Sequence, residues 1–378
     1  SLTFLGKGPP DFADQAIDGM VAPTPGNKVD VGDTTTVDAA VPGRETLVAP
    51  HPPASSKGEN MTRTIGTVAV IGAGYMGGGI AQVTAIAGIP VSIFDLDAES
   101  TQRHYDRLVA EAKTFESQGL FPEGATDAVQ ANLRAAHSLQ DAVRGADLVE
   151  EAVLEIPDVK GPVLTAIEAA AEPHAIIATN TSTLPIAELA KNLQDQSRIL
   201  GVHFSNPSPF IPGVELITHE ACDLSMLEPI EEYITKLGKQ SARVQDKAGF
   251  VLNRLQFAFF KLACELVEEG VATVEDIDTV VRTTFGFRLP FFGPFAIADM
   301  AGLHTYLNCF QSMQQHYGDA YAPPRALVEL VEAGKHGAIS GGGFRVGDGD
   351  HGDLVKFRTE AYARQAQLVA QMGPAPLT

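Results

Sequence analysis

The strongest constraint on the fold is a glycine-rich turn between a strand and a helix. Residues 67–71 are apolar and β-branched, which is typical of a buried parallel strand, and a helix is predicted over 78–88. The turn has the spacing G-x-G-x-x-G, in which the glycines allow a tight turn, close approach to a pyrophosphate and close helix packing. It predicts a dinucleotide site with contacts from Gly72, Gly74, Tyr75, Met76 and Gly77. A glycine-rich turn of another α/β protein is the alternative.

Asp95 indicates which dinucleotide is bound. It ends the next predicted strand, 90–95, and lies 18 positions after Gly77. A carboxylate there accepts hydrogen bonds from ribose hydroxyls and repels a 2′-phosphate, and no arginine follows within five residues. The sequence therefore favours NAD over NADP. FAD can use the same fingerprint, but nothing further along requires a flavin.

Polar residues follow the later strands at one edge of the predicted sheet. Strands are expected over 146–149, 175–179 and 198–203. The loops at the carboxyl ends of parallel strands line the ligand crevice. The side chains expected in that crevice are Glu155, Ser182, His203 and Asn206.

His203 is the best candidate for a catalytic base. It closes a strand, precedes an Asn-Pro-x-Pro loop, and is followed by the strand 213–217, in which Glu215 is the only charged residue. A buried carboxylate is costly unless paired, and an imidazole is a natural partner. The pair would hold one ring nitrogen and leave the other to take a hydroxyl proton. A satisfied structural histidine is the alternative reading.

Charge and cysteine content exclude several classes. The formal net charge of −20 argues against nucleic acid or anionic membranes as partners. The three cysteines lie far apart, so neither disulfides nor a metal site is expected. We find neither an apolar run of about 20 residues nor a secretory pattern at the N-terminus, so we expect a soluble cytoplasmic protein.

Three regions are expected along the chain. Residues 1–60 hold eight of the 24 prolines without apolar periodicity, which predicts a disordered tail. We expect the native start at Met61 and a non-native upstream segment, with an interaction tail or a remnant of a fused domain as alternatives. An NAD-binding domain is predicted over 61–245. A helical substrate and dimerisation domain is predicted over 246–378, with helices over 249–272, from Thr273, over 295–317 and over 325–333.

Six motifs stand in one order along this chain and resemble the 3-hydroxyacyl-CoA dehydrogenase superfamily from Met61 onward. They are Gly72 to Gly77, Glu151-Ala-Val-Leu-Glu155, Asn180-Thr-Ser-Thr183, His203-Phe-Ser-Asn-Pro207, Val214-Glu-Leu216 and Gly249-Phe-Val-Leu-Asn-Arg254. The resemblance implies a Rossmann-type doubly wound α/β domain followed by an all-α C-terminal domain that forms a homodimer. It also implies an NAD-dependent dehydrogenase that oxidises a secondary alcohol β to a carboxyl-type carbonyl.

The same resemblance implies roles for single residues. His203 would be the general base and Glu215 its orienting partner. Ser182 and Asn253 would hydrogen-bond the substrate oxygens, although Asn253 can also be read as an ordinary polar residue at a helix start. The residues expected to contact NAD are Asp95, Glu155 and Lys160. Asn206 would help to hold the substrate or the nicotinamide end.

Departures from the family pattern bear on the substrate. Where the acyl-CoA enzymes usually have a short Pro-Met-Gly-Pro turn, residues 286–294 are longer and carry Arg288. This form is more similar to relatives that act on small free acids, such as L-gulonate, carnitine or pyridine-carboxylate alcohols, where an arginine suits a carboxylate. Residues 106–116 are also acidic, which suits the phosphates of CoA poorly.

The sequence leaves two classes of substrate open. The sequence favours a small hydroxy acid bound by Arg288, with an L-3-hydroxyacyl-CoA as the alternative and a surface or ion-paired role as the alternative for the arginine. Enzymes of the 3-hydroxyisobutyrate and 6-phosphogluconate type share the fingerprint, but they resemble this chain poorly after Thr179. A non-catalytic NAD-binding protein is the alternative from another class.

Overall fold

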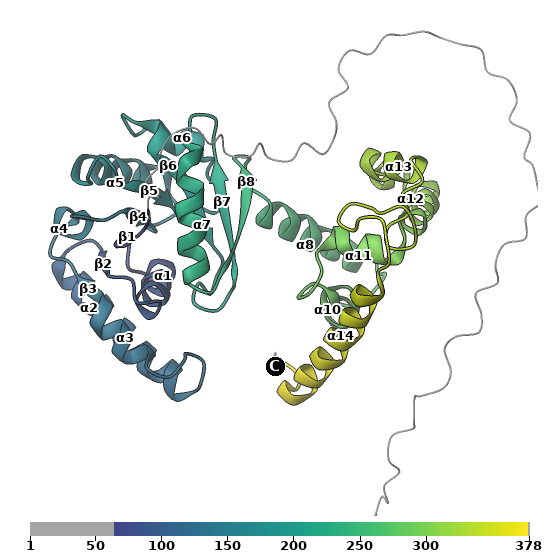
Figure 1. Cartoon of the computed structure of the whole chain (residues 1–378), viewed down its shortest axis with the longest axis horizontal. Coiled ribbons are helices and arrows are strands. Elements are labelled where there is room, and N and C mark those ends of the chain that lie inside the picture. Colours follow the sequence, from purple (N-terminus) through teal and green to yellow (C-terminus); the bar gives the residue numbers. More distant parts are fainter. Residues whose placement is uncertain (1–63, 377–378) are drawn as a thin grey trace, which may run out of the picture. The chain divides into compact units, whose positions relative to one another are not determined.

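The computed structural model describes residues 64–376, shown in Figure 1. The expectations for residues 1–60, including a native start at Met61, lie outside the described residues. Within the described range, no helix combines the length and the apolar content that a membrane crossing requires.

An eight-stranded sheet forms the first part of the described chain, with the order β3-β2-β1-β4-β5-β6-β7-β8. The strands are β1 Val68–Ile71, β2 Val91–Phe94, β3 Leu133–Ala135, β4 Leu148–Glu151, β5 Ile176–Thr179, β6 Ile199–Phe204, β7 Gly213–Thr218 and β8 Gln240–Gln245. Strands β1 to β6 pair in parallel. The order 3-2-1-4-5-6 is the doubly wound order, in which the ligand crevice opens between β1 and β4. The predicted Rossmann-type fold is confirmed.

Helices cover both faces of this sheet because successive side chains of each strand point to opposite sides. In β1, Val68 and Val70 belong to one buried cluster, whereas Ala69 and Ile71 belong to the other. The first face is covered by α1 Tyr75–Ile86, α2 Ala98–Ser117, α3 Ala125–Asn132 and α7 Leu227–Lys236. The second is covered by α4 Leu139–Val143, α5 Pro157–Ala170 and α6 Ile186–Ala190. Because helices cover both faces, the side chains on both faces are apolar, and the sequence of each covered strand is a nearly continuous apolar run.

The sheet differs from a purely parallel one in its last two strands. β7 runs antiparallel to β6, and β8 pairs in parallel with β7. The expectation of an open parallel sheet did not include this reversal, nor the strands β3 and β8. β3 has three residues and β8 is a largely exposed edge strand, so neither carries the apolar run by which strands were predicted.

The second part of the described chain is helical, as predicted. Its helices are α8 Leu252–Glu268, α9 Val274–Val280, α10 Gly286–Arg288, α11 Pro294–Ala301, α12 Leu303–Tyr317, α13 Arg325–Glu332 and α14 Gly352–Met372. A π-helical turn, Val281–Phe285, joins α9 to α10. The helix start at Thr273 is confirmed, since the Thr273 hydroxyl accepts the N–H of Asp276.

Three details of the helical part correct the sequence-based expectations. The single helix predicted over 295–317 is two helices, because Gly302 has a φ of +94°, which a continuous α-helix does not allow. The helix predicted over 249–272 starts later, after Gly249 and Phe250 with φ values of +75° and +48°. Helix α14 was not predicted; a segment rich in glycine and aspartate precedes it.

Glu150 is a buried carboxyl group without a partner in the described chain. Its side chain is 1% exposed, and both carboxyl oxygens lack a hydrogen bond. It lies in β4 between Val70 of β1 and Ala178 of β5, two residues of the first buried cluster. Burial, with a smaller contribution from the charge of Glu151, raises the pKa of Glu150 well above its ordinary value. The group is therefore protonated in the folded protein.

Replacement of Glu150 by methionine is expected to stabilise the protein at neutral and alkaline pH. The folded state keeps a proton that the unfolded chain releases near the ordinary pKa of about 4.3, so the wild type loses stability as the pH rises above that value. Glu150→Met removes this loss and the unsatisfied polar group, a gain of about 1–3 kcal/mol near pH 8. Urea denaturation at several pH values measures both effects. Parallel pH profiles for the two proteins would contradict the assignment.

Candidate active site

His203 and Glu215 face each other across two strands. They are directly opposite in the antiparallel pairing of β6 and β7, so their side chains project from the same face of the sheet. The His203 Nδ1 atom lies 2.9 Å from Oε2 of Glu215, and both side chains are about nine-tenths buried. The reversal of β7 therefore creates the pair that the sequence predicted.

Glu215 fixes the tautomer of His203. Burial opposes its ionisation, but the hydrogen bond from His203 and those from the N–H groups of Leu252 and Val251 outweigh burial and lower the pKa of Glu215. An ionised carboxylate can only accept, so Nδ1 carries the hydrogen and donates it. The Nε2 atom of a neutral His203 is thereby left as an acceptor.

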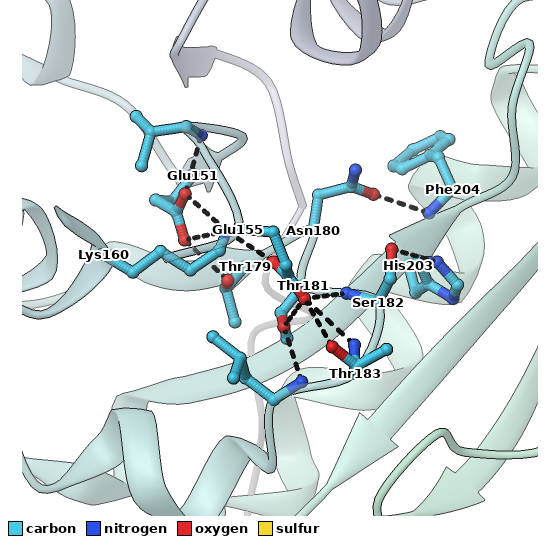
Figure 2. A network of polar contacts seen from close by, with 12 residues as sticks. Glu151, Glu155, Lys160, Thr179, Asn180, Thr181, Ser182, Thr183, His203 and Phe204 are labelled. Carbon is cyan, nitrogen blue, oxygen red and sulfur yellow. Dashed lines mark hydrogen bonds and ion pairs between the residues drawn. The ribbon is translucent and has the colours of Figure 1, made fainter. Parts of the chain in front are cut away.

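Ser182 lies at the free nitrogen of this imidazole. It follows β5, and its Oγ is 3.2 Å from Nε2 of His203 (Figure 2). With Nδ1 protonated, the hydroxyl donates to Nε2. A substrate hydroxyl that reaches Nε2 would lie next to the Ser182 hydroxyl as well, so both groups can contact one oxygen.

Glu155 holds the loop that carries Ser182. Its Oε1 accepts the N–H groups of Ser182 and Thr183, at 2.8 and 3.0 Å, and the hydroxyl of Thr181, at 2.7 Å (Figure 2). Partial burial opposes ionisation, but these hydrogen bonds and the Lys160 charge outweigh it and lower the pKa of Glu155. Glu155 therefore acts on Ser182 as an anchor, and a contact with NAD remains a prediction.

Lys160 is enclosed by carboxylates. Its side chain is 1% exposed, and Nζ lies 2.9 Å from Oε1 of Glu151 and 3.4 Å from Oε2 of Glu155. Glu151 also accepts the hydroxyl of Thr179 and the N–H of Val153. A buried lysine needs such partners to remain charged. Its contact with NAD remains a prediction.

Asn253 joins the start of α8 to the Ser182 loop. Its Nδ2 donates to the backbone oxygen of Ser182 at 2.8 Å. The N–H groups of Val251 and Leu252 donate to Oε1 of Glu215, both at 3.0 Å. Hydrogen bonds thus connect four of the predicted site residues in one network: Ser182, His203, Glu215 and Asn253.

The glycine turn has the geometry that a dinucleotide requires. Gly72 has a φ of +94°, and a Cβ on Gly77 would lie 1.9 Å from the Gly72 oxygen. A Cβ on Gly74, by contrast, would meet nothing within 4 Å. The open space at Gly74 is where the backbone of such turns approaches a pyrophosphate.

A pocket of about 590 Å³ adjoins the turn. Its wall includes Gly72, Gly74, Asp95 and apolar side chains such as Leu139 and Val163. Asp95 accepts the Ala73 N–H through Oδ2, at 2.7 Å, which fixes its carboxylate beside the turn. An apolar slot next to a fixed carboxylate fits an adenosine with its ribose hydroxyls on Asp95.

Some predicted residues lie apart from the network. Asn206 is exposed, and its side chain makes no hydrogen bond with the described residues. Tyr75 is 66% exposed on the first turn of α1, and Met76 packs partly against the first buried cluster. Arg288 lines another pocket, together with residues of α11 and α14.

Glu151 and Thr181 were missed by the sequence analysis. Glu151 is fully buried, and Thr181 both donates to Glu155 and accepts the Leu184 N–H. The signal that identified Glu215, a carboxylate in a buried strand, also applies to Glu151 in β4. Thr181 had only its place in the run 180–183 as a signal.

Comparison with known proteins identifies the family. The model of the 3-hydroxyacyl-CoA dehydrogenase NAD-binding domain matches residues 67–247, and that of the C-terminal domain of the same family matches 249–346. The chain belongs to the 3-hydroxyacyl-CoA dehydrogenase family. It is an NAD-dependent dehydrogenase that acts on CH–OH groups, as the sequence predicted.

Relatives with different names share this fold. A 3-hydroxybutyryl-CoA dehydrogenase of Mycobacterium tuberculosis is 36% identical over 75% of this chain and 99% of the relative. A 3-hydroxyacyl-CoA dehydrogenase of Archaeoglobus fulgidus has a TM-score of 0.67 at 26% identity, over 80% of this chain and 99% of the other. The structure of 5-formyl-3-hydroxy-2-methylpyridine-4-carboxylic acid 5-dehydrogenase has a TM-score of 0.61 at 30% identity, over 82% of this chain and 100% of the other.

Alanine at Gly74 is expected to weaken cofactor binding without destabilising the protein. Gly74 has a φ of −62° and open space around it, so the apo protein accepts a Cβ. A bound pyrophosphate would meet that Cβ, at a cost of about 1–3 kcal/mol, or roughly tenfold or more in the Kd of NADH. Calorimetric titration measures the Kd and thermal unfolding the stability.

Gly77→Ala is the matched control because its Cβ collides with backbone rather than with ligand space. This variant should lose thermal stability even without cofactor. Wild-type NADH affinity in Gly74→Ala would show that the turn does not contact the cofactor.

Proposed function

We propose that the protein oxidises a secondary alcohol β to a carboxyl-type carbonyl, with His203 as the general base. The observation that carries this proposal is the chain of contacts from Glu215 to His203 to Ser182, at 2.9 and 3.2 Å. It presents one basic nitrogen and one hydroxyl to a common point. Removal of a hydroxyl proton at that point is the step that alcohol oxidation requires of the protein.

The proposed proton transfer uses only groups with fixed positions. NAD⁺, when bound, accepts the hydride from the carbon. Nε2 of His203 takes the hydroxyl proton, and the imidazolium that forms is stabilised by the Glu215 carboxylate. The Ser182 hydroxyl moves its hydrogen bond from Nε2 to the substrate oxygen. Asn253 holds the Ser182 backbone, and its free amide atoms are available for a second substrate oxygen.

Further contacts are assigned to the cofactor end. Asp95 would accept the ribose hydroxyls, and Gly72, Gly74, Tyr75, Met76 and Gly77 would surround the pyrophosphate. Glu155 contacts both Lys160 and the Ser182 N–H, and we propose that Glu155 and Lys160 face the nicotinamide half. Asn206, exposed in the loop after β6, would hold the substrate or the nicotinamide end.

For the substrate we propose a small free hydroxy acid. Arg288 has no carboxylate partner in the described chain and lines a pocket, as an arginine that binds a substrate carboxylate would. The pyridine-carboxylic acid dehydrogenase that covers 82% of this chain is named for a small acid. A CoA thioester is the second candidate, favoured by the names of the curated relatives at 33 to 36% identity.

A substrate panel separates the two candidates. Absorbance of NADH is followed with a set of small hydroxy acids and with 3-hydroxybutyryl-CoA. We expect kcat/KM to be higher for a free acid. Turnover of the CoA thioester alone would refute the proposed substrate and leave the reaction class intact.

His203→Gln is expected to lose about 10²-fold or more in turnover on the best substrate of that panel. Glutamine keeps a polar side chain but cannot take the proton, so the Kd of NADH should stay as in the wild type. His174, which is exposed, supplies a control in His174→Gln with unchanged turnover. Near-normal turnover of His203→Gln would remove His203 from the reaction, and no turnover by any protein would favour a non-catalytic NAD-binding role.

We also propose that residues 246–378 form a dimerisation domain. Helix α8 buries none of its residues, and it exposes Leu255, Phe257, Phe259 and Phe260 by 44 to 63%. Large apolar patches of this kind are rare on monomers. A second copy that covers α8 is the proposed partner, so the protein should sediment as a dimer and Phe260→Asp as a monomer. A monomeric wild type would contradict the dimer.

A further inference from the structure

An arginine of α2 contacts the backbone of the glycine turn. Nη2 of Arg107 donates to the backbone oxygen of Ala73 at 3.0 Å and to that of Gly74 at 3.2 Å. These are the two carbonyl groups immediately before α1, which starts at Tyr75. Arg107 does not line the pocket of about 590 Å³ that adjoins the turn. It therefore reaches the proposed cofactor site through these two peptide groups.

The guanidinium group of Arg107 is fixed by a second set of contacts. Its Nη1 donates to Oε1 of Glu111, one turn further along α2, at 2.8 Å. The Gln82 side chain of α1, which is 1% exposed, reaches the other Glu111 oxygen at 3.4 Å and the Leu108 backbone oxygen at 2.9 Å. Helices α1 and α2 pack together on the first face of the sheet (Figure 1). Their contacts thus fix where the arginine lies.

Gly78 leaves the space that Arg107 occupies. It lies in α1, where glycine is less favourable than alanine, and the spacing G-x-G-x-x-G does not include it. A Cβ on Gly78 would lie 2.9 Å from Nη2 of Arg107 and 2.8 Å from Cδ2 of Leu108. Because this Nη2 atom is the one that contacts the turn, alanine at position 78 would displace the guanidinium group. The contact of Arg107 with the turn thus accounts for a fourth glycine.

The two contacts determine which way the next N–H groups point. The peptide bonds from Ala73 to Tyr75 are trans, and in a planar trans peptide the N–H points opposite to the C=O. Because both carbonyl groups point toward Arg107, the N–H groups of Gly74 and Tyr75 point away from it. Neither of them donates to another residue of the described chain. Free N–H groups at the start of a helix bind anions, and a cation at the carbonyl strengthens them as donors.

We infer that Arg107 is a positioning residue for the cofactor pyrophosphate and acts through the N–H groups of Gly74 and Tyr75. This inference rests on the proposed contact of the glycine turn with the pyrophosphate. The guanidinium group holds both peptides in the orientation that a phosphate oxygen needs before the cofactor arrives. Such pre-organisation raises affinity, because the turn does not have to be ordered at the moment of binding.

The binding test compares two arginines of α2. Arg107→Met is expected to raise the Kd of NADH about tenfold, the loss that one charge-assisted hydrogen bond predicts. Arg103→Met removes the same charge from the same helix, where Arg103 pairs with Glu99, and should leave the Kd within about twofold. Arg107→Lys should recover part of the affinity, because lysine keeps the charge and loses the planar fork. Equal Kd values for Arg107→Met and Arg103→Met, measured by calorimetric titration, would overturn the inference.

Gly78→Ala gives a second route to the same effect, because it displaces the guanidinium group without removing it. It should also raise the Kd of NADH, but it should add little to the loss in a double variant with Arg107→Met. Two substitutions that act through one contact are not additive, whereas independent ones are. Fully additive losses would overturn the inference.

Steady-state kinetics separates positioning of the cofactor from a general loss of structure. On the best substrate of the panel, Arg107→Met should raise the KM for NAD⁺ and leave kcat and the KM of the alcohol within about twofold. A fall in kcat together with a rise in both KM values would show a structural role and overturn the inference.

The Gly74→Ala variant separates this inference from the proposed contact on which it rests. Weak NADH binding by Gly74→Ala with wild-type binding by Arg107→Met overturns the role of Arg107 and leaves the contact of the turn standing. Wild-type binding by both variants refutes the contact of the turn and the role of Arg107 together.

Discussion

The site depends on the hydrogen bonds that the carboxylate of Glu215 accepts. One oxygen accepts Nδ1–H of His203, and the other accepts the first N–H groups of α8. A single ionised group therefore sets the tautomer of the imidazole and fixes where the helical part of the chain begins. Phe250 lies in the turn between β8 and α8, has a φ of +48° and is 2% exposed. Its ring centroid lies 6.0 Å from that of the His203 ring. Such backbone conformations cost about 1–3 kcal/mol and persist where surrounding contacts enforce them.

A second group of carboxylates places the remaining site residues. Glu155 binds the loop of Ser182, and Lys160 links it to Glu151 inside the sheet. Ser182 and His203 are 21 residues apart in sequence, but Ser182 follows β5 and His203 lies in the neighbouring strand β6, so the pairing of these two strands determines both positions. Glu151 and Glu155 thus hold the geometry of this part of the site, because both accept hydrogen bonds from the protein itself, whereas Glu150 has no hydrogen-bond partner in the described chain.

Most of the sheet part could be predicted because local patterns determine it. A run of β-branched residues, three glycines and an acidic strand end are enough to specify a dinucleotide-binding unit, and Gly72, Gly77 and Asp95 adopt the geometry that this pattern implies. The pairing of His203 with Glu215 could also be predicted, since a carboxylate in a buried strand needs a partner. The edge strand β8 and the short strand β3 were not predicted, because they bury little apolar surface. Helix α14 was not predicted either, because nothing in its own sequence indicates what it packs against.

The amino-acid sequence by itself determined the family, the cofactor class and the pairing of His203 with Glu215, because these depend on residue types at short spacings. Only the tertiary structure decided that β7 runs antiparallel, that Asn253 reaches the Ser182 backbone and that Arg288 shares a pocket with Arg358. Asn253 and Ser182 are 71 positions apart, and Arg288 and Arg358 are 70 positions apart. Contacts over such separations follow from how whole elements pack, which no local pattern encodes.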